Sequence, residues 1–94
     1  MNHSIIHFMK KDKSIHDLRY HSLIEALTSE RKRLNISQAD LADKVGMNQS
    51  DISKIEQLER RLDVLEFVRI LEAFRISENK HFSEKITALL GMEI

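Results

Sequence analysis

Four polar side chains are grouped in the middle of the sequence, within the stretch "NQSDISKIE" at residues 48–56. They are Gln49, Ser50, Ser53 and Lys54. In a helix their spacing places them on one face, and Ile52 and Ile55 on the opposite face. Glutamine can form two hydrogen bonds with adenine, lysine can donate to guanine, and serine can contact either base. The exposed face therefore has the chemistry needed to read base edges in DNA.

Two short helices joined by a tight turn would position this face. The stretch "SQADLADKVGMNQSDISKIE" contains two apolar-periodic runs. Ser37 and Asn48 can each cap the N-terminus of a helix, and Gly46 supplies the turn between the two runs. A helix-turn-helix at about residues 37–57 is the prediction, and its second helix must be short so that it can enter a major groove.

Three further helices are predicted around this pair. The first runs from about Ser22 to Leu34, because Ser22 and Glu25 have the spacing of a capping box. Asp63 and Glu66 have the same spacing at the start of the fourth helix. The fifth covers about residues 79–90 and ends at Gly91. The apolar stripes of these helices are Leu23, Leu27 and Leu34; Leu65, Val68, Leu71 and Phe74; and Phe82, Ile86, Leu89 and Leu90.

The composition agrees with a small all-α domain. Ninety-four residues, 41% hydrophobic and 32% charged, suffice for one modest core. There is no proline and there are two glycines, too few turn residues for a β-sandwich or barrel. We expect the domain to cover residues 19–94, preceded by a short N-terminal extension at residues 1–18. In that extension "SIIHFM" is read as a short strand or an apolar clip, and "KKDK" as solvated and mobile.

Several classes of protein are disfavoured. The five histidines fit no compact ligand set except His3 with His7, so neither a metal nor another cofactor is expected. No nucleophile-base arrangement, phosphate-cradling loop or paired carboxylates in a cleft can be recognised, so the chain is not expected to be an enzyme. The absence of cysteine, of a long apolar run and of a secretory signal favours a cytoplasmic protein that does not insert into a membrane.

The charge pattern restricts how the chain could bind DNA. The formal net charge is zero, which counts against binding any polyanion without regard to sequence. Residues 19–34 carry a net charge of +2, whereas residues 37–56 carry −2. If the second segment touches DNA, most of its acidic side chains must point elsewhere.

The stretch "SQADLADKVGMNQSDISKIE" resembles the DNA-binding core of the XRE-type helix-turn-helix family, which includes phage repressors of the Cro and C1 kind. The resemblance covers about residues 20–74, and "ERRLDVLEFVRILEAF" is similar to the continuation common among bacterial members. Its combined markers are Ser37-Gln38, Leu41-Ala42, Gly46, Gln49-Ser50, Ile52-Ser53 and Ile55-Glu56. The resemblance implies a five-helix, lambda-repressor-like domain that binds double-stranded operator DNA as a homodimer. In a chain this small, part of the apolar stripe of the C-terminal helix could be left over for a two-fold partner, which makes this helix a candidate dimer interface.

The resemblance also implies roles for individual residues. The glutamine that opens the first helix of the pair, here Gln38, would grip a phosphate. The positions of the base readers are Gln49, Ser50 and Lys54, with Ser53 close by. Asn48 and Arg60 or Arg61 would hold phosphates and fix the register. Many members have a glycine where this chain has Leu58, so the loop that carries both arginines either takes another conformation or offers Leu58 to a partner.

Plainer interpretations stand beside these roles. Gln38 and Asn48 could serve only as helix-capping residues, and Lys54 could be simply solvated. Asp51 fits a helix end better than a cytosine reader. Glu56 fits a structural tie for the loop. The cluster Arg31-Lys32-Arg33 fits either a phosphate patch or a solvated face equally well.

The expected function is that of a sequence-specific repressor. Such a protein would read a near-palindromic operator as a dimer, regulate its own gene and work at the nucleoid. The alternative is an antitoxin that binds a protein toxin and represses their shared operon, which would suit the apolar ends "SIIHFM" and "ITALLGMEI". A third interpretation is an adaptor that keeps the fold and binds only protein.

Overall fold

A computed structural model describes residues 14–92 of the chain, and these residues form five α-helices and two short 3-10 turns. The elements are, in order, η1 (Ser14–His16), α2 (Leu18–Arg33), α3 (Gln38–Val45), α4 (Gln49–Glu56), α5 (Val64–Ala73), η2 (Ile76–Glu78) and α6 (Lys80–Leu89). Residues 14–92 contain no strand. The prediction of an all-α domain with five helices is therefore confirmed.

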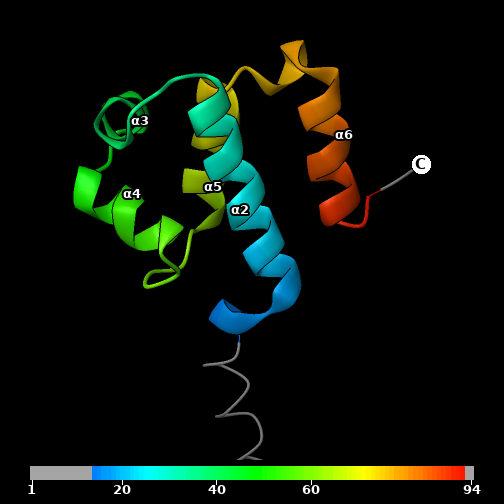
Figure 1. The fold of residues 1–94 in the computed structure, drawn as a ribbon, viewed down its shortest axis with the longest axis horizontal. Coiled ribbons are helices and arrows are strands. Elements are labelled where there is room, and N and C mark those ends of the chain that lie inside the picture. Colours follow the sequence, from blue (N-terminus) through cyan, green and yellow to red (C-terminus); the bar gives the residue numbers. More distant parts are fainter. Residues whose placement is uncertain (1–13, 93–94) are drawn as a thin grey trace, which may run out of the picture.

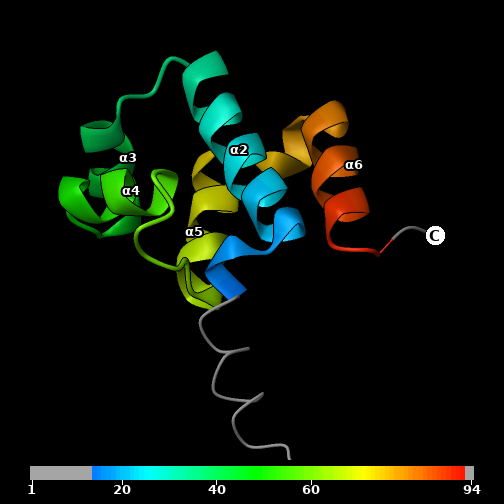
Figure 2. The same ribbon diagram turned by 60° about the horizontal axis from the view of Figure 1, so that its bottom comes forward.

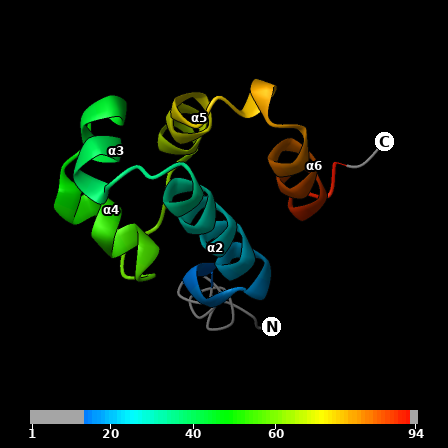
Figure 3. The same cartoon turned by 45° about the horizontal axis from the view of Figure 1, so that its top comes forward.

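Helix α2 runs through the middle of the domain and separates the other helices into two groups (Figure 1). Helices α3 and α4 lie on one side of it and α6 lies on the other, an arrangement that the view in Figure 3 also shows. Helix α5 packs against α3, whereas α6 has its main contacts with α2 and η2. The pair α3–α4 thus forms one edge of the molecule, away from α6.

One cluster of buried side chains joins all five helices. Each of its twelve members is at most 5% exposed: Ile24, Ala26, Leu27, Leu41, Ala42, Val45, Ile52, Ile55, Ile70, Phe74, Phe82 and Ile86. Five of them come from α3 and α4, although each of these helices has only eight residues. Burial of an aliphatic side chain contributes about 1.5–3 kcal/mol. Tertiary packing therefore stabilises two helices that would be too short to persist alone.

The predicted starts and ends of α3, α4 and α6 are confirmed because their signals are local. The Ser37 hydroxyl accepts a hydrogen bond from the Asp40 N–H (3.0 Å), which caps α3. Gly46 ends α3 in the left-handed conformation at φ 72°. The Asn79 side chain caps α6 by accepting from the Phe82 N–H (3.0 Å). Asn35, expected at a helix stop, is also left-handed, at φ 59°.

The predicted start of the first helix is wrong. Helix α2 begins at Leu18, and the Asp17 carboxylate caps it by accepting from the backbone N–H groups of Arg19 (2.8 Å) and Tyr20 (3.2 Å). Ser22 is exposed within the helix. Asp17 offers an equally good cap one turn earlier. The expectations for residues 4–9 and 10–13 lie outside the described residues.

The N-terminal end of α2 is fastened to the start of α5. The Tyr20 hydroxyl accepts a hydrogen bond from the Leu62 N–H (3.0 Å), across 42 residues of sequence. Figure 2 shows η1 and the first turn of α2 next to the start of α5. The first helix therefore packs on both groups of helices.

The capping box of α5 is confirmed, but its predicted apolar stripe is partly wrong. The Asp63 carboxylate accepts from the Glu66 N–H (2.8 Å), and the Glu66 carboxylate accepts from the Asp63 N–H (3.1 Å). Leu65 and Val68, expected in the core, are 57% and 42% exposed. Phe74 is buried as predicted, and Ile70 is buried with it. Ile70 lies near Ile24 and Leu27 of α2, and the Phe74 ring lies against Phe82 of α6. The predicted inward face of α5 is therefore correct at its C-terminal end and wrong at Leu65 and Val68.

The loop after α4 keeps a backbone conformation that favours glycine. Leu58 has φ 64°, its N–H donates to the Ile55 carbonyl (3.0 Å), and its side chain packs against the core. Leu58 therefore has the left-handed conformation that suits a glycine, the residue that many members of the similar family have at this position. Such a conformation costs a residue with a Cβ about 1–2 kcal/mol.

Replacing Leu58 by glycine is expected to destabilise the domain less than replacing it by alanine, by about 1 kcal/mol. Both variants lose the packing of the side chain, but only alanine keeps a Cβ at φ 64°. Urea unfolding followed by circular dichroism measures the difference. The same pair of substitutions at the exposed, helical Glu84 is the control, and there alanine should be the more stable by about 1 kcal/mol. A more stable Leu58→Ala would contradict the proposed strain.

A buried carboxylate connects α2 to α6. Glu30 is 6% exposed, accepts two hydrogen bonds from the Arg33 guanidinium (both 2.9 Å) and accepts one from the Asn79 amide (2.8 Å). The hydrogen bonds from Arg33 lower the pKa of Glu30, against the opposing effect of burial, and Asn79 lowers it further. Asn79 thus caps α6 and holds it to α2 at the same time.

Acid is expected to destabilise the domain partly through Glu30. Folding lowers the pKa of this carboxyl, so its stabilising contribution is complete above the ordinary value of about 4.3 and is lost as the pH falls below it. The free energy of unfolding is measured at about pH 6 and about pH 3, on either side of this ordinary value. It should fall less between these two pH values in Glu30→Gln than in the unmodified chain. Glu84→Gln, at an exposed glutamate on α6, controls for the loss of one charge. Parallel pH curves for Glu30→Gln and the unmodified chain would refute the assignment.

Candidate nucleic-acid interface

Helices α3 and α4 form the predicted helix-turn-helix. Gly46 turns the chain, and the Met47 N–H donates to the Ala42 carbonyl (2.9 Å), which closes the end of α3. Helix α4 then starts at Gln49, after the N-cap residue Asn48. Ile52 and Ile55 are 2% and 3% exposed and fix this helix to the core. The side of α4 that carries Gln49, Ser50 and Lys54 is left to solvent.

The structure brings the four candidate base readers together on α4. Gln49, Ser50 and Lys54 are exposed, and Ser53 is half-buried between them and the core. The Ser53 hydroxyl accepts a hydrogen bond from the Gln57 amide (3.0 Å), which leaves its own proton available to an acceptor. Gln49 and Ser50 occupy the first turn of α4, the part of a recognition helix that contacts bases.

Asn48 lies exposed at the N-terminus of α4 and makes no capping hydrogen bond with its side chain. Its backbone carbonyl accepts from the N–H groups of Asp51 (3.1 Å) and Ile52 (3.3 Å), so the backbone alone begins the helix. The capping interpretation of this side chain is therefore not realised in the structure. The amide remains available to a ligand at the positive end of the helix dipole.

Gln38 is held by a network of buried polar groups. Its amide donates to Glu56 Oε1 (2.9 Å), and the same carboxylate accepts two hydrogen bonds from Arg31, through Nε (2.7 Å) and Nη2 (2.9 Å). Arg31 also donates to the Ile36 carbonyl (2.8 Å). The Arg31 and Glu56 side chains are only 9% and 13% exposed. The network joins α2, the start of α3 and the end of α4, so it fixes the orientation of the helix pair.

Arg31 is neither the phosphate contact nor the solvated residue that its sequence neighbours suggested. Its guanidinium is buried and paired with Glu56, 25 residues away. A sequence signal exists, since Arg31 follows Ile24 and Leu27 at the helical spacing of the buried stripe of α2. Glu56 is the structural tie that the sequence suggested, although it ties down Arg31 and Gln38 rather than the loop alone.

Arg60 is also paired within the protein. Its guanidinium donates to both carboxylate oxygens of Glu66 (2.9 and 2.8 Å), and its Nε lies 3.8 Å from an oxygen of Asp51. The hydrogen bonds from Arg60 lower the pKa of Glu66. A phosphate would have to share Arg60 with Glu66. Arg61 is exposed in the same loop. This loop joins the end of α4 to the cap of α5.

A profile of helix-turn-helix domains matches residues 27–80, more than half of the chain. This chain belongs to the XRE-type helix-turn-helix family. The match begins within α2 and ends at the start of α6, so it includes α3, α4 and the polar network between them. As a member of this family, the protein is a DNA-binding transcription regulator. None of the curated proteins compared with it matches the chain.

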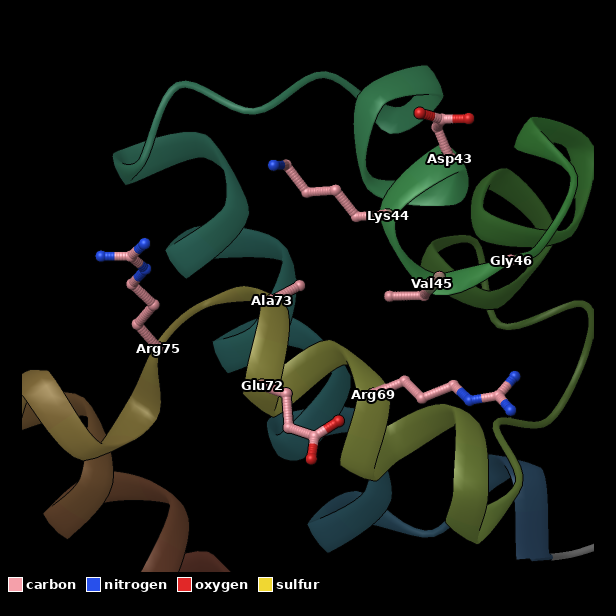
Figure 4. A pocket seen from close by; sticks show the side chains of 8 residues that line it. All are labelled: Asp43, Lys44, Val45, Gly46, Arg69, Glu72, Ala73 and Arg75. Atoms are coloured by element: carbon pink, nitrogen blue, oxygen red, sulfur yellow. The ribbon is translucent and has the colours of Figure 1, made fainter.

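Two of the four acidic residues between positions 37 and 56 lie next to arginines of this XRE-type domain. Glu56 is turned inward toward Arg31, and Asp51 lies next to Arg60. Asp40 and Asp43 are exposed on α3. Asp43 is among the residues that line the groove between α3 and α5, and in Figure 4 its carboxylate points away from α5. The net negative charge of residues 37–56 is thus partly neutralised within the protein.

The groove in Figure 4 is an open hollow of about 700 Å³ between α3 and α5. Its lining consists of Asp43, Lys44, Val45, Gly46, Arg69, Glu72, Ala73 and Arg75. These described residues include no histidine, cysteine or hydroxyl group. The lining includes no residue of α4, so the groove lies beside the reading face rather than on it.

Two further properties of residues 14–92 bear on the function. This part of the chain has no group of three or more histidine, cysteine, aspartate or glutamate side chains placed to hold a metal ion. His16 and His21 lie near each other, with ring centroids 6.3 Å apart, and the His21 ring contacts the Ile15 carbonyl. Among the helices of residues 14–92, none has the length and apolar content required to cross a bilayer.

Proposed function

We propose that this XRE-type protein is a sequence-specific repressor that regulates its own gene. Two copies would bind a near-palindromic operator and place their α4 helices in successive major grooves, about 34 Å apart. The observation that carries the proposal is the exposure of Gln49, Ser50 and Lys54 on a helix whose opposite face is buried. A role at the nucleoid, in the cytoplasm, follows from this proposal.

The polar side chains around α4 divide into two groups in this proposal. Gln49, Ser50, Ser53 and Lys54 read base edges. Gln38, Asn48, Arg60 and Arg61 bind phosphates and set the position of the domain on the duplex. The network with Glu56 supports the role of Gln38, because it holds the amide at the N-terminus of α3, where backbone N–H groups attract an anion.

The proposal is tested by fluorescence anisotropy with labelled DNA. One duplex carries the sequence upstream of the protein's own gene, and a scrambled duplex of the same composition is the control. Titrations at two salt concentrations should show tighter binding to the native fragment and a steep loss of affinity at higher salt, because each neutralised phosphate releases counterions. Equal affinities for both duplexes at both salt concentrations would contradict autoregulation.

An antitoxin is the second candidate, and the apolar residues away from α4 favour it. Leu18, Leu90 and Met92 are 81%, 40% and 63% exposed, and none of them belongs to the helix-turn-helix. Exposed apolar side chains commonly mark protein-binding surfaces. A neighbouring gene for a toxin that forms a stable complex with this protein would establish the antitoxin. The two proteins would be co-expressed, and size-exclusion chromatography would show whether they elute together as a complex.

A further inference from the structure

The hydroxyl of Ser53, on the proposed reading face, already has one hydrogen-bonding partner within the protein. The Gln57 amide donates to its oxygen, with 3.0 Å between Nε2 and Oγ. A serine hydroxyl offers one proton and two lone pairs, so an unpartnered serine can contact either a base that donates or a base that accepts. At Ser53 the amide occupies one lone pair. The proton and a single lone pair are what remain for DNA.

The proton of Ser53 has no acceptor among residues 14–92, where the Gln57 amide is the one hydrogen-bonding partner of this hydroxyl. Hydroxyl groups in helices commonly donate to the carbonyl four residues earlier, as Thr87 does to Ser83 (2.8 Å). Within the same residues, the Ser53 hydroxyl makes no such bond to the carbonyl of Gln49. The proton is therefore left for a ligand that reaches this side of α4.

We propose that Gln57 is a positioning residue that determines which bases Ser53 selects. The inference deepens the proposed function and rests on it. Docking on DNA removes water from the hydroxyl, and a donor left unpaired in a dry contact is costly. Guanine and thymine present acceptors in the major groove, so either base pairs the Ser53 proton. Cytosine presents an amino group there, which would leave the proton without a partner.

The backbone on both sides of Gln57 is held in place. The Gln57 N–H donates to the Ser53 carbonyl (3.0 Å), so the amide is anchored to the same residue whose hydroxyl it contacts. Leu58, the next residue, donates its N–H to the Ile55 carbonyl (3.0 Å) and packs its side chain against the core. The Gln57 side chain is itself exposed. A substitution at Gln57 should therefore alter the hydroxyl of Ser53 and leave the fold intact.

Selection from a pool of random-sequence duplexes tests the proposal. Sequencing of the bound DNA gives the base preference at each position. Ser53→Ala identifies the base pair that Ser53 reads, because the preference for guanine or thymine over cytosine is lost there. Gln57→Ala should reduce the preference at the same base pair by about twofold to tenfold, the range of one hydrogen bond, and leave other positions unchanged. The double variant should lose no more than Ser53→Ala, because Gln57 acts through the hydroxyl.

Gln57→Glu gives the sharpest readout, because it reverses the polarity of the contact. The new carboxylate accepts the proton of Ser53, which leaves only lone pairs for DNA. The preference at the Ser53 base pair should shift from guanine or thymine toward cytosine. Neither a loss of stability nor a change in net charge inverts the preference at one base pair. Glu59→Ala, at an exposed residue of the same turn, is the matched control and should retain the original preference.

The outcomes distinguish this inference from the proposed function. A preference at the Ser53 base pair that both Gln57 variants retain would overturn the inference alone. So would a preference for cytosine there in the unmodified chain, a Ser53→Ala variant with unchanged preferences, or a loss in Gln57→Ala at a different base pair. Binding of the unmodified chain without any sequence preference would overturn the proposed function together with this inference.

Discussion

Replacing Glu56 by alanine is expected to lower the free energy of unfolding by about 3–5 kcal/mol. The Arg31 guanidinium would remain buried, with a hydrogen bond to the Ile36 carbonyl but without its carboxylate partner, and an uncompensated buried charge is costly. Small domains are stable by only about 5–15 kcal/mol, so this loss is a large fraction of the total and should lower the midpoint of unfolding markedly. Urea unfolding monitored by circular dichroism measures the loss.

The double variant Arg31→Met/Glu56→Met distinguishes two effects: the destabilisation caused by leaving one buried charge unpaired, and the net contribution of the intact ion pair to stability. Removing both charges and keeping the volume should restore most of the stability, since a buried pair contributes little compared with apolar packing. The double variant also removes the acceptor that holds Gln38. It should therefore fold and yet bind both native and scrambled DNA more weakly. An unfolding midpoint for Glu56→Ala equal to that of the unmodified chain would show that the pair is not a structural requirement.

Replacing Gln49 by alanine is expected to weaken binding to the native operator fragment by about 1–3 kcal/mol and to leave binding to scrambled DNA nearly unchanged. Gln49 is exposed in the first turn of α4 and can form two hydrogen bonds with one adenine. The loss corresponds to a factor of about 5 to 150 in Kd at 25 °C. Anisotropy titrations with both duplexes measure it.

Gln38→Ala is the contrasting variant, because a phosphate contact carries no sequence information. It should weaken binding to both duplexes to a similar extent. Glu84→Ala changes an exposed side chain on α6, away from the helix-turn-helix, and controls for an alanine substitution that touches neither group. Equal losses of Gln49→Ala on the two duplexes would end its role as a base reader. A loss of Gln38→Ala confined to the native fragment would end the phosphate assignment.

The features that were predicted correctly have determinants within four residues of each other. Ser37 with Asp40, Asp63 with Glu66, and Gly46 between two short helices each specify a helix end by local hydrogen bonds or by backbone freedom. The exposure of the reading face on α4 followed from the helical period, because Ile52 and Ile55 leave only one side to solvent.

The features that were missed depend on distant parts of the chain. The partner of Arg31 is 25 residues away, and no local pattern identifies it. Leu65 and Val68 have the spacing of core residues, but burial depends on which side of α5 the other helices cover, and the side that carries these two residues is left exposed. The start of α2 was missed because Asp17 and Ser22 both provide capping side chains and the choice depends on how far the helix packs.

The sequence also gave no indication that Arg60 is paired with Glu66. The two residues are six positions apart, on either side of the capping box, and only the folded loop brings them together. The roles of Gln38, Gln49 and their neighbours in contacting DNA remain proposals that the two titrations test. The structure supports these proposals by showing where each side chain lies and how exposed it is.

The hydrogen bond between Gln38 and Glu56 has a consequence for the heat and entropy of DNA binding. Because this amide is ordered before DNA arrives, docking onto the phosphate backbone requires little loss of side-chain freedom. Non-specific encounters are then driven mainly by the entropy of released ions. Gln49, Ser50 and Lys54 are exposed and must lose rotamer freedom when they meet the bases. Binding to the operator should consequently have a more favourable enthalpy than non-specific binding. The ratio of the affinity for the operator to the affinity for random DNA should therefore decrease as the temperature rises.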